Sequence, residues 1–548
     1  MDDIFSDCMR DVPRSFIRET LKDALMPGTI SFAGGLPNRD LFPAQQIRAA
    51  SDKAFDTYGK DLFQYSPSEG LAELRDWIAS RYKDKGLAIS ADNILITSGA
   101  QQGLDLLGKT LLNDGDGVVI EEPGYLGAIQ AFAICGARFL PVPVSEEGID
   151  YEALASAIKA HRPKLIYTVP NFQNPSGISY TEANRRAAAK VIKGTNTLLI
   201  EDDPYGDLRF SGEARTSFKA LLPEQTVLLG SFSKVVVPGF RIGWLAAPDA
   251  LMQKLIVAKQ AADLHTNQFA QCVLFQYLCD NRIDEHIAII VAAYGARKTA
   301  MTDAIRTHFP AQVTHTQPEG GMFLWARLPG DLAAMDLFTL AAKEKVIFVP
   351  GDPFYIGQSR VNTFRLNYSC SDLESISSGI QRLGGAIHAL LKNKMLDKKK
   401  AGQASLETQY RLAQGDWQSL GAAARVVRDA VFIAEQGIDE ALEHDERDAL
   451  TDHVVLFADP IPVATGRIDR DGKIGRVAVL KSYRRRGFGH RVMKALEAQA
   501  RQLGLAKVYV HAQSTVVPFY LGLGYRPLGK EMMEAGIPHR FMEKTFAS

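Results

Sequence analysis

Five apolar runs separated by segments of mostly helical length constrain the fold of this 548-residue chain more than any other feature. All five lie within residues 90–250, and their apolar residues are continuous rather than alternating. Continuous apolar runs are typical of strands buried on both faces of a largely parallel sheet, so we predict an α/β fold with helices over that sheet. Ligands of such sheets lie at the carboxyl ends of the strands. The runs are Gly117–Glu121, Leu165–Val169, Thr197–Glu201, Val227–Gly230 and Ile242–Ala246.

The length of the chain exceeds that of one ordinary domain, and the clearest seam lies at residues 391–408. This stretch is basic and then small and polar, with little to bury. Its lysines could contact an anionic partner, but a solvated helix end followed by a linker fits the composition better. We predict a first domain over residues 1–390, a linker over 391–408 and a second α/β domain over 409–548.

The charge balance gives no sign of a nucleic-acid or membrane partner, because basic and acidic residues number 63 each. No apolar run approaches the roughly 20 residues that a bilayer requires. The start, Met1–Phe5, is acidic and lacks the pattern of a signal peptide. The five cysteines are scattered and form no C-x-x-C pair, so we predict neither a disulfide framework nor a metal site. We expect a cytoplasmic protein that acts on small molecules.

The segment Ser231–Trp244 places Lys234 directly after a predicted buried strand. Burial makes a charged lysine costly unless its pKa falls or it becomes an imine, and both outcomes are useful in catalysis. Ser231, Ser233 and Arg241 are suitable hydrogen-bond donors to a phosphate. Taken alone, the segment also fits a buried lysine whose amine reaches the surface.

Polar motifs follow two others of these strands and a further predicted strand, Asn93–Thr97. They are Asn171–Gly177, Glu201–Gly206 and Ser98–Gly103, and the last opens a helix whose amino terminus suits an anion. With this ordered set, roughly residues 10–390 resemble the class I/II aminotransferases of pyridoxal-phosphate fold type I. The branch most similar contains the 2-aminoadipate and kynurenine aminotransferases. The resemblance implies a large domain with a mostly parallel sheet and a small domain.

The resemblance also implies roles for individual residues. Lys234 would hold pyridoxal 5′-phosphate (PLP) covalently and later move the proton between substrate and cofactor. Asp202 would face the ring nitrogen of PLP; Asp203 competes for this position, but the spacing to Tyr205 favours Asp202. Tyr125 would stack on the ring, although a plain core tyrosine is the alternative. Contacts to the cofactor are also implied for Tyr65, Gly99, Ala100, Gln101, Asn174, Tyr205, Ser231, Ser233 and Arg241.

Three residues are implied to contact substrate. Arg365 matches the arginine that holds the α-carboxylate, a geometry that favours loss of the Cα proton over loss of carbon dioxide. Gly35 lies in the loop Ser31–Pro37 that closes over substrate in this branch, and Arg18 aligns with an arginine that reads an acidic side chain. A solvated helix arginine is the alternative for Arg18. The set favours glutamate or 2-oxoglutarate as one partner. Tyr65 matches a residue that reaches the neighbouring subunit, which implies a homodimer.

A glycine-rich loop marks the second domain. A predicted strand, Ile474–Leu480, precedes the loop Tyr483–His490 and the amphipathic helix Arg491–Ala500. Its glycines allow backbone amides to face a pyrophosphate, although turn glycines beside a basic patch would look similar. With Lys507–Gln513 as a further strand, residues 409–548 resemble the GNAT acetyltransferases. We expect this domain to begin with helices at Tyr410, and Val426–Gln436 to form an early strand and its exit.

This second resemblance implies acetyl-CoA as co-substrate. The pantetheine arm would pair with Val477 and Val479, and Tyr520 would donate a proton to the departing thiolate unless it is a core aromatic. Candidates for the general base, on position alone, are Glu435 and His511, and His539 could belong to the acceptor pocket. The pyrophosphate would be held by Arg484, Arg485, Gly487 and Gly489.

Both resemblances together predict a bifunctional enzyme that carries out amino transfer and acetyl transfer. Elimination or decarboxylation on the same PLP fold is an alternative, as is a GNAT-like domain that senses acetyl-CoA without catalysis. A transcriptional regulator is a third alternative, because aminotransferase-like domains also follow DNA-binding winged helices. The neutral charge and the early start of the aminotransferase-like region argue against a regulator.

Overall fold

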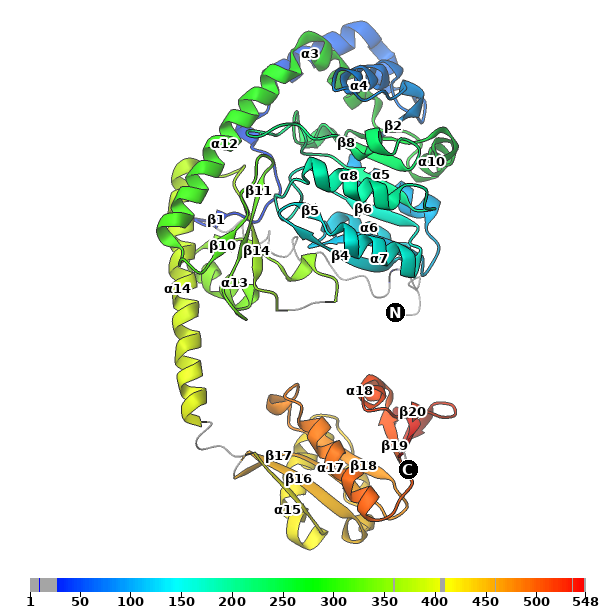
Figure 1. The fold of residues 1–548 in the computed structure, drawn as a ribbon, viewed down its shortest axis with the longest axis vertical. Helices are drawn as coiled ribbons and strands as arrows, with labels where there is room; N and C mark the ends of the chain where they lie inside the picture. The colour runs from blue at the N-terminus through cyan, green and yellow to red at the C-terminus, as the bar shows by residue number, and fades with distance from the viewer. Residues whose placement is uncertain are drawn as a thin grey trace. The chain divides into compact units, whose positions relative to one another are not determined.

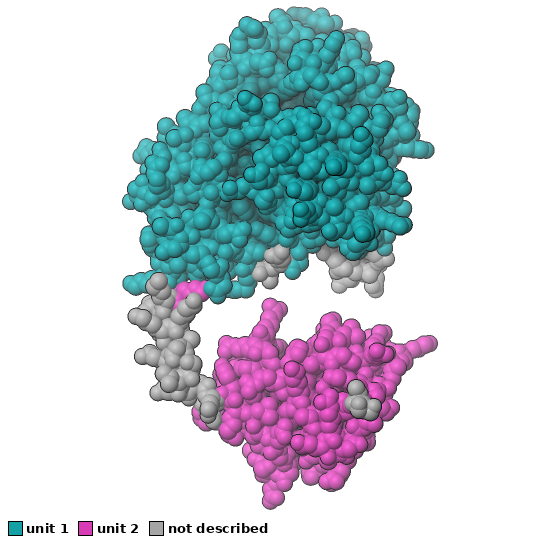
Figure 2. All heavy atoms as spheres, viewed as in Figure 1, with its two compact units in different colours: residues 1–393 teal, residues 394–548 magenta. Residues whose placement is uncertain are grey.

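The computed structural model describes residue 9 and residues 27–357, 360–404, 410–458, 460–534 and 536–546. The chain divides into two compact units, Met1–Asn393 and Lys394–Ser548, which are described separately (Figures 1 and 2). Arg18 falls outside the described residues. No helix in the described part of the chain is long and apolar enough to cross a membrane.

An eight-stranded sheet forms the centre of the first unit, in the order β2-β9-β8-β7-β6-β3-β4-β5 (Figure 1). The pairings from β8 through β7, β6 and β3 to β4 are parallel, whereas β9 runs antiparallel to both β8 and β2. All five predicted strands are present, and the mostly parallel sheet is confirmed. Its strands are β2 (Ile94–Thr97), β3 (Gly117–Glu122), β4 (Arg138–Ser145), β5 (Gly148–Ile149), β6 (Leu165–Thr168), β7 (Leu198–Asp202), β8 (Thr226–Ser231) and β9 (Gly243–Ala246).

Helices cover both faces of this sheet, because successive strand residues point to opposite sides. Ile120 and Ile200 are buried in one cluster with α5 and α6, whereas Val119 and Leu199 are buried in another with α7 and α8. Side-chain caps set two of the helix starts: Asp150 accepts hydrogen bonds from two amides at the start of α7, and Thr181 accepts one from Asn184 N at the start of α8. These helices are α5 (Ala100–Leu111), α6 (Leu126–Ile134), α7 (Tyr151–His161) and α8 (Glu182–Ile192).

A smaller antiparallel sheet, in the order β10-β11-β14-β13, lies towards the carboxyl end of the first unit. The short strand β1 (Ile30–Ser31) pairs with β12 (Val346–Ile347), and Phe32 O accepts a hydrogen bond from Asn367 N at 2.9 Å. The N-terminal segment is thereby attached to β14. The strands are β10 (Thr314–His315), β11 (Phe323–Arg327), β13 (Val349–Pro350) and β14 (Thr363–Asn367). The remaining main helices are α3 (Ala44–Tyr58), α4 (Ala72–Asp84), α10 (Asp249–Ala262), α11 (Gln268–Asp280), α12 (Ile283–His308) and α13 (Ala334–Lys343).

The predicted linker is largely helical. Helix α14 (Leu373–Ala404) runs through most of residues 391–408, and the boundary between the two units falls inside it. Its first half carries buried Ile376, Ile380, Leu383 and Ile387 at helical spacing. The lysine- and alanine-rich residues that follow are good helix formers, so the backbone stays helical where the sequence suggested a linker. Polar composition at this seam therefore did not end the helix.

The second unit contains two sheets and three main helices. One sheet has the order β15-β16-β17-β18, and the other has β19-β22-β20 with β21 attached to β22. The helices are α15 (Trp417–Arg428), α17 (Phe488–Gln502) and α18 (Val517–Gly522). The strands are β15 (Tyr410–Gly415), β16 (Asp452–Ala458), β17 (Ile461–Ile468), β18 (Ile474–Val479), β19 (Lys507–Gln513), β20 (Arg526–Pro527), β21 (Met532–Glu534) and β22 (Ile537–Thr545).

Two expectations for the second unit are wrong. The unit begins with strand β15 rather than with a helix, and Val426–Gln436 forms no strand. Val426 lies in the last turn of α15, and a π-helical turn, η7 (Asp429–Ile433), follows. Leu420, Ala424, Val427 and Val431 are buried at helical spacing, so tertiary packing overrides the β preference of the paired valines.

Candidate functional site

Lys234 lies in the turn that follows β8 and is half-buried. Its amine donates a hydrogen bond to Gly35 O at 3.0 Å. Burial lowers the pKa of Lys234 to about 8; the Cys370 thiol opposes this, whereas Arg241 and Arg365 lower the pKa further. Roughly a tenth of the amine is then neutral at pH 7, compared with less than about a thousandth for an ordinary lysine. Lys234 is therefore prepared to act as a nucleophile near neutral pH.

The low pKa of Lys234 predicts a specific labelling profile. Trace acetylation of the folded protein, freed of PLP, with acetic anhydride should rise with pH and reach half of its maximum near pH 8, because only the neutral amine reacts. In protein unfolded in urea, the same peptide should reach half-maximum near the ordinary value of about 10.4. Mass spectrometry of the peptide gives both curves. Coincident curves for folded and unfolded protein would show that burial does not perturb Lys234.

Asp202 ends strand β7 and is buried. Tyr167 Oη donates to its Oδ2 at 2.7 Å, whereas Oδ1 is buried without a hydrogen-bond partner among the described residues. Burial raises the pKa of Asp202 to about 7; the Tyr167 hydrogen bond lowers it, and Asp203 and Glu121 raise it further. A buried acceptor without a partner costs roughly 1–3 kcal/mol, so this carboxylate is suited to a buried cationic donor. Asp203, by contrast, is held by Asn171 Nδ2 at 2.9 Å.

The turn from β2 into α5 forms an anion cradle at the amino end of a helix. Gly99 has a φ of +79° there, and a Cβ at this position would lie 2.4 Å from Arg241 Nη2. The Arg241 guanidinium donates to Ser98 O at 3.3 Å. Ala100 and Gln101 open the helix, so their amides have no partner within the first turn of the helix.

Two serines join this cradle from the end of β8 and from the turn that follows it. Ser231 Oγ accepts a hydrogen bond from Ser233 N at 3.1 Å, and both serines are buried. Gly243 pairs with Ser231 across the sheet, and a Cβ on Gly243 would lie 2.7 Å from Ala100 N. The two glycines therefore let the serines, the helix start and Arg241 meet closely enough to hold a phosphate.

Tyr125 provides an aromatic face beside Asp202. Its ring lies within 24° of parallel to that of Tyr167, with 6.4 Å between centroids. The Tyr125 hydroxyl donates to Gln101 Oε1 at 3.5 Å, which links the ring to the cradle. Burial raises the pKa of Tyr125 to about 12, so the phenol is neutral and suited to stacking on a flat ring.

Arg365 lies on β14 and is buried. Its Nη1 donates to Asn174 Oδ1 at 2.7 Å and its Nη2 donates to Ala33 O at 2.6 Å, whereas Nε has no partner among the described residues. Burial lowers the pKa of Arg365 to about 10. The guanidinium lies 4.4 Å from the ring centroid of Phe323, an aromatic wall that sequence reasoning did not find. A carboxylate would complete this buried cation.

The loop Ala33–Leu36 is held by the site itself, through its backbone carbonyls. Arg365 donates to Ala33 O, Lys234 donates to Gly35 O, and Ser369 Oγ donates to Leu36 O at 2.8 Å. Gly35 approaches closely, because a Cβ there would lie 3.3 Å from Phe323 Cζ. The predicted substrate residue Gly35 is therefore brought next to Lys234 and Arg365.

The strand ends thus gather nearly all the residues predicted for the first site. Tyr205 is buried with its ring edge-on to Phe323 at 5.9 Å, and burial raises its pKa. Tyr65 differs, since it is 79% exposed and has its ring edge-on to His265 at 5.8 Å. Arg18 falls outside the described residues.

Besides Phe323, two side chains that hold this site in place were missed by sequence reasoning. Tyr167 anchors Asp202, but its strand read only as an apolar run. Glu121 is buried at the end of β3 and accepts hydrogen bonds from Val169 N at 2.9 Å and Gln173 Nε2 at 2.9 Å. It thereby fixes the start of the loop that carries Asn174. A buried acid at the carboxyl end of a strand was the signal that could have identified it.

The two sheets of the second unit diverge from a single parallel bridge. Lys473 pairs with Tyr509 there, and in the described part of the chain β18 and β19 form no further pairs. The edge of β18 from Gly475 to Val479 is therefore open on the side of β19. We call the space between these strand segments the strand gap. Val477 and Val479 border it, so an extended ligand with amide groups can pair with this edge.

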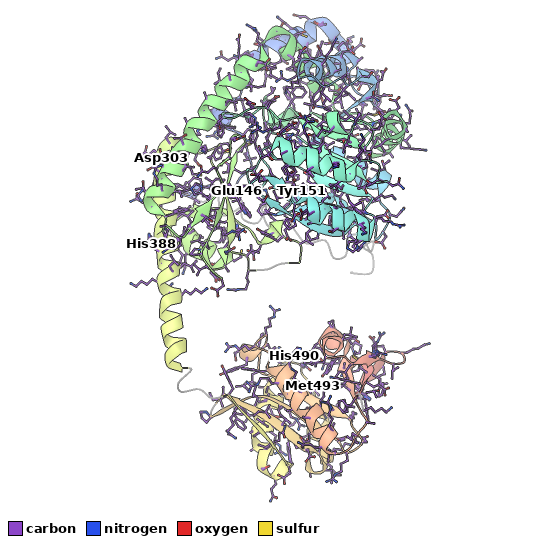
Figure 3. All side chains as sticks on the ribbon, in the orientation of Figure 1. Glu146, Tyr151, Asp303, His388, His490 and Met493 are labelled. Carbon is purple, nitrogen blue, oxygen red and sulfur yellow. The ribbon has the colours of Figure 1, made fainter. Side chains whose placement is uncertain are left out.

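The glycine-rich loop leads into α17, whose amino end carries His490 (Figure 3). Gly487 caps this helix with a φ of +78°, and a Cβ on Gly489 would lie 3.3 Å from Phe519 Cζ. Arg485 is exposed beside the loop. The loop therefore presents helix-start amides and a cation to the solvent, as an anion site requires.

Arg484 is engaged within the protein. Its Nε donates to Val479 O at 3.0 Å, and its two Nη atoms donate to the Glu435 carboxylate, each at 2.7 Å. The hydrogen bonds and charge of Arg484 lower the pKa of Glu435, which is unfavourable for a general base. Of the two arginines predicted to hold a pyrophosphate, Arg485 is thus the more accessible, and Glu435 is a weaker candidate for the base.

Tyr520 lies on α18 and is 8% exposed. Its ring centroid lies 5.0 Å from that of Phe519 and 5.7 Å from that of Tyr525. Burial raises the pKa of Tyr520 to about 12, so the phenol keeps its proton and can donate it. Of the two histidines named as candidates for this site, His511 Nδ1 is bonded to Glu534 Oε1, and His539 Nδ1 contacts Ile537 O at 2.9 Å.

Comparison with known proteins shows that two stretches of the chain match family models. Residues 35–383 match the family model of the class I and II aminotransferases, and residues 415–546 match that of the GNAT acetyltransferase domain. The chain is 40% identical over 385 residues to a 2-aminoadipate transaminase of Thermus thermophilus, which covers 69% of this chain and 95% of that protein. It is 37% identical over 398 residues to aromatic-amino-acid aminotransferase 1 of Thermococcus litoralis, covering 71% and 95%.

A solved structure is similar over the same region. The kynurenine aminotransferase of Pyrococcus horikoshii, crystallised in complex with PMP, has a TM-score of 0.68 and 38% sequence identity to this chain. The similarity covers 71% of this chain and 98% of that one.

Proposed function

Because the chain belongs to the class I and II aminotransferases and carries a C-terminal GNAT acetyltransferase domain, we propose that it is a bifunctional enzyme. Both resemblances inferred from the motifs are confirmed by the family matches. In the proposed first reaction, an amino group moves between an α-amino acid and a 2-oxo acid with PLP as cofactor. In the second, an acetyl group moves from acetyl-CoA to a small amine or amino acid.

One observation supports the first assignment: a buried carboxylate and a buried guanidinium near Lys234 each have one atom without a hydrogen-bond partner among the described residues. These atoms are Asp202 Oδ1 and Arg365 Nε. The ring nitrogen of PLP would supply the donor that Asp202 lacks, and the cradle at Gly99 and Arg241 would hold the phosphate. When bound, PLP supplies an electron-accepting ring that stabilises negative charge at Cα.

The side chains of the protein perform the other tasks in this proposal. Lys234 anchors the cofactor, and its released amine takes the proton from Cα and returns one. Asp202 keeps the ring nitrogen protonated, while Tyr205 and Asn174 donate to the phenolic oxygen. Arg365 holds the α-carboxylate of the substrate, which favours loss of the Cα proton over loss of carbon dioxide. This grip supports transamination rather than decarboxylation.

Glutamate or 2-oxoglutarate is the proposed partner of one half-reaction. The support is the buried cation Arg365 next to Gly35, together with relatives named for 2-aminoadipate and aromatic amino acids. Arg18 is proposed to read an acidic side chain. The other substrate is proposed to be larger and less polar.

A homodimer is proposed for the first unit. Tyr65 is 79% exposed beside exposed Phe55 and Phe63, whose rings pack with Phe269 at 5.7 and 6.4 Å. Exposed aromatic groups of this kind favour a protein interface. A second copy would then receive Tyr65 at its phosphate cradle.

The direct test is an absorbance spectrum of the protein reconstituted with PLP, followed by titration with a panel of amino acids. A visible band that bleaches with particular amino acids, while the matching 2-oxo acids appear, identifies amino transfer and its donor. Release of carbon dioxide or pyruvate instead would assign decarboxylation or elimination. Absence of a visible band would contradict the assignment of Lys234.

Replacing Tyr520 with phenylalanine separates catalysis from sensing in the second domain. We expect acetyl transfer to fall on the order of 10²-fold, because the departing thiolate loses its proton donor. CoA affinity, measured by calorimetry, should be unchanged. The neighbouring Tyr525→Phe is the matched control, since Tyr525 is buried in the same cluster. A wild-type domain that binds acetyl-CoA but transfers no acetyl group would be a sensor.

A further inference from the structure

An aromatic face lies on the second sheet of the second unit. Tyr509 and His511 on β19 and Phe541 on β22 form it, and we call these three residues the aromatic face. The ring centroids of Tyr509 and Phe541 are 5.3 Å apart with planes 29° from parallel, and those of His511 and Phe541 are 5.7 Å apart. The opposite face of β19, with Val508 and Val510, is buried in the core. The aromatic face is therefore the partly exposed side of this sheet.

His511 is oriented by a carboxylate from a separate strand. Its Nδ1 is bonded to Glu534 Oε1 on β21, and the His511 side chain remains 20% exposed. When Nδ1 carries the hydrogen of this bond, Nε2 of the neutral imidazole is an acceptor. A histidine held in this way by a carboxylate is prepared to take a proton. Tyr509 is held likewise, because its hydroxyl donates to Asp471 Oδ2 at 2.8 Å.

His511 lies on β19 along the strand gap. Tyr509 closes the gap at the bridge to Lys473, and His511 follows two residues further along β19. Gln513, two residues beyond, donates to Gln436 Oε1 at 2.9 Å. The residue before Gln436, Glu435, pairs with Arg484, which in turn binds Val479 O on the other side of the gap. His511 thus lies between the closed end of the gap and the turn that crosses it.

We propose that His511, oriented by Glu534, is the base that deprotonates the acyl acceptor, and that the acceptor is a protonated amine bound on the aromatic face. This inference rests on the acetyl transfer proposed above. Aromatic rings attract a cation, and the attraction grows as the cation loses its hydration. The carboxylates that face the site, Glu534 and Asp471, favour a cationic over an anionic acceptor.

The proposed step balances as follows. His511 Nε2 takes one proton from the ammonium, and the neutral amine nitrogen attacks the thioester carbonyl carbon of acetyl-CoA. The new carbon–nitrogen bond forms, the carbon–sulfur bond breaks, and the thiolate takes a proton from Tyr520. The second nitrogen proton restores Tyr520, and His511 releases its proton to water. The products are the acetamide, CoA thiol and one proton.

The other candidate bases are less suited. Arg484 engages both carboxylate oxygens of Glu435. His539, which pairs with Gln513 across the sheet, has its Nδ1 turned to Ile537 O within its own hairpin. Glu435 is therefore occupied by an ion pair. His539 has no carboxylate partner among the described residues.

The test uses the full-length protein with acetyl-CoA and two amine probes, with thiol release as the readout. One probe is 2-phenylethylamine, which is protonated at neutral pH, and the other is methoxyamine, which is not. For His511→Gln we expect kcat/KM with 2-phenylethylamine to fall on the order of 10²–10⁴-fold. The residual rate should rise about tenfold per pH unit, since only free amine then reacts. Methoxyamine should be acetylated within about threefold of the wild-type rate, because it needs no base.

Matched variants distinguish a base from a structural residue. His444→Gln, which removes a histidine paired with Asp429 and outside the aromatic face, should leave both rates unchanged. Glu534→Gln should lower the 2-phenylethylamine rate by about tenfold and retain CoA affinity. If His511→Gln loses CoA affinity, its defect is structural, and Glu534→Gln with the two probes decides the question.

The outcomes separate the two proposals. Wild-type protein that acetylates neither these amines nor any amino acid overturns acetyl transfer and the inference with it. Wild-type protein that acetylates 2-phenylethylamine, together with a His511→Gln variant of unchanged rate and pH profile, overturns the base assignment alone. Acetylation of L-glutamate but not of 2-phenylethylamine would overturn the cationic acceptor.

Discussion

Lys234→Ala is expected to abolish amino transfer, with a loss on the order of 10⁴-fold or more. Two proposed functions would disappear together in this variant, the covalent hold on PLP and the amine that moves the Cα proton. The visible band of the reconstituted protein should also disappear, although the phosphate cradle at Gly99 and Arg241 is intact. Amino transfer is measured as 2-oxo acid formed from the best donor of the panel.

The control for this variant is Lys254→Ala, which removes an exposed lysine from α10. It should retain the band and the activity. Acetyl transfer by the second domain should be the same in both variants, and an unchanged circular dichroism spectrum and melting temperature would show that the first unit is folded. A Lys234→Ala protein with a normal band and more than about a hundredth of wild-type activity would mean that another lysine anchors the cofactor.

Asp202→Asn is expected to lower amino transfer by about 10²–10³-fold, the size seen when one preorganised charge-stabilising group is removed. Asparagine keeps the shape and the Tyr167 hydrogen bond but removes the negative charge. The ring nitrogen of PLP would then lose its proton, and with it the ability of the ring to accept electrons. The binding of PLP should weaken less than catalysis, because the phosphate contacts remain.

Asp203→Asn is the matched control, because Asp203 is adjacent, half-buried and also a carboxylate, directly after β7. Its Oδ1 is already satisfied by Asn171, so amino transfer should fall less than about tenfold. Kinetics of both variants with the same amino acid decide between the two aspartates. The reverse order of effects would assign Asp203 to the ring nitrogen.

The strands and the first site were largely predictable from the sequence because their signals are local. Continuous apolar runs identify buried strands, and parallel strands bring the motifs that follow them to one edge. This logic applies to Lys234 and Asp202, each of which directly follows or ends such a run. The roles assigned to them are predictions that the variants above test.

The parts that could not be predicted depend on contacts between distant residues. The pairing of Arg484 with Glu435 joins positions 49 residues apart, and nothing local indicates it. Tyr167 reads as a core residue until the fold places Asp202 beside it. Val426 lies in a helix rather than in the expected strand because neighbouring residues of that helix are buried in the second unit. Helix α14 continues to Ala404 because lysine and alanine have high helix propensity, which a reading of polar composition alone does not take into account.

The loop Ala33–Leu36 draws on the same donors that the first reaction needs. Arg365 Nη2 and the Lys234 amine donate hydrogen bonds to its carbonyls. A substrate carboxylate that recruits Arg365, or a cofactor that takes Lys234, competes with the loop for these donors. Occupancy of the site and closure of the loop are therefore thermodynamically linked, and each ligand that binds changes the free energy of holding the loop in place. Amide hydrogen exchange in this segment would thus report which step of the reaction the enzyme has reached.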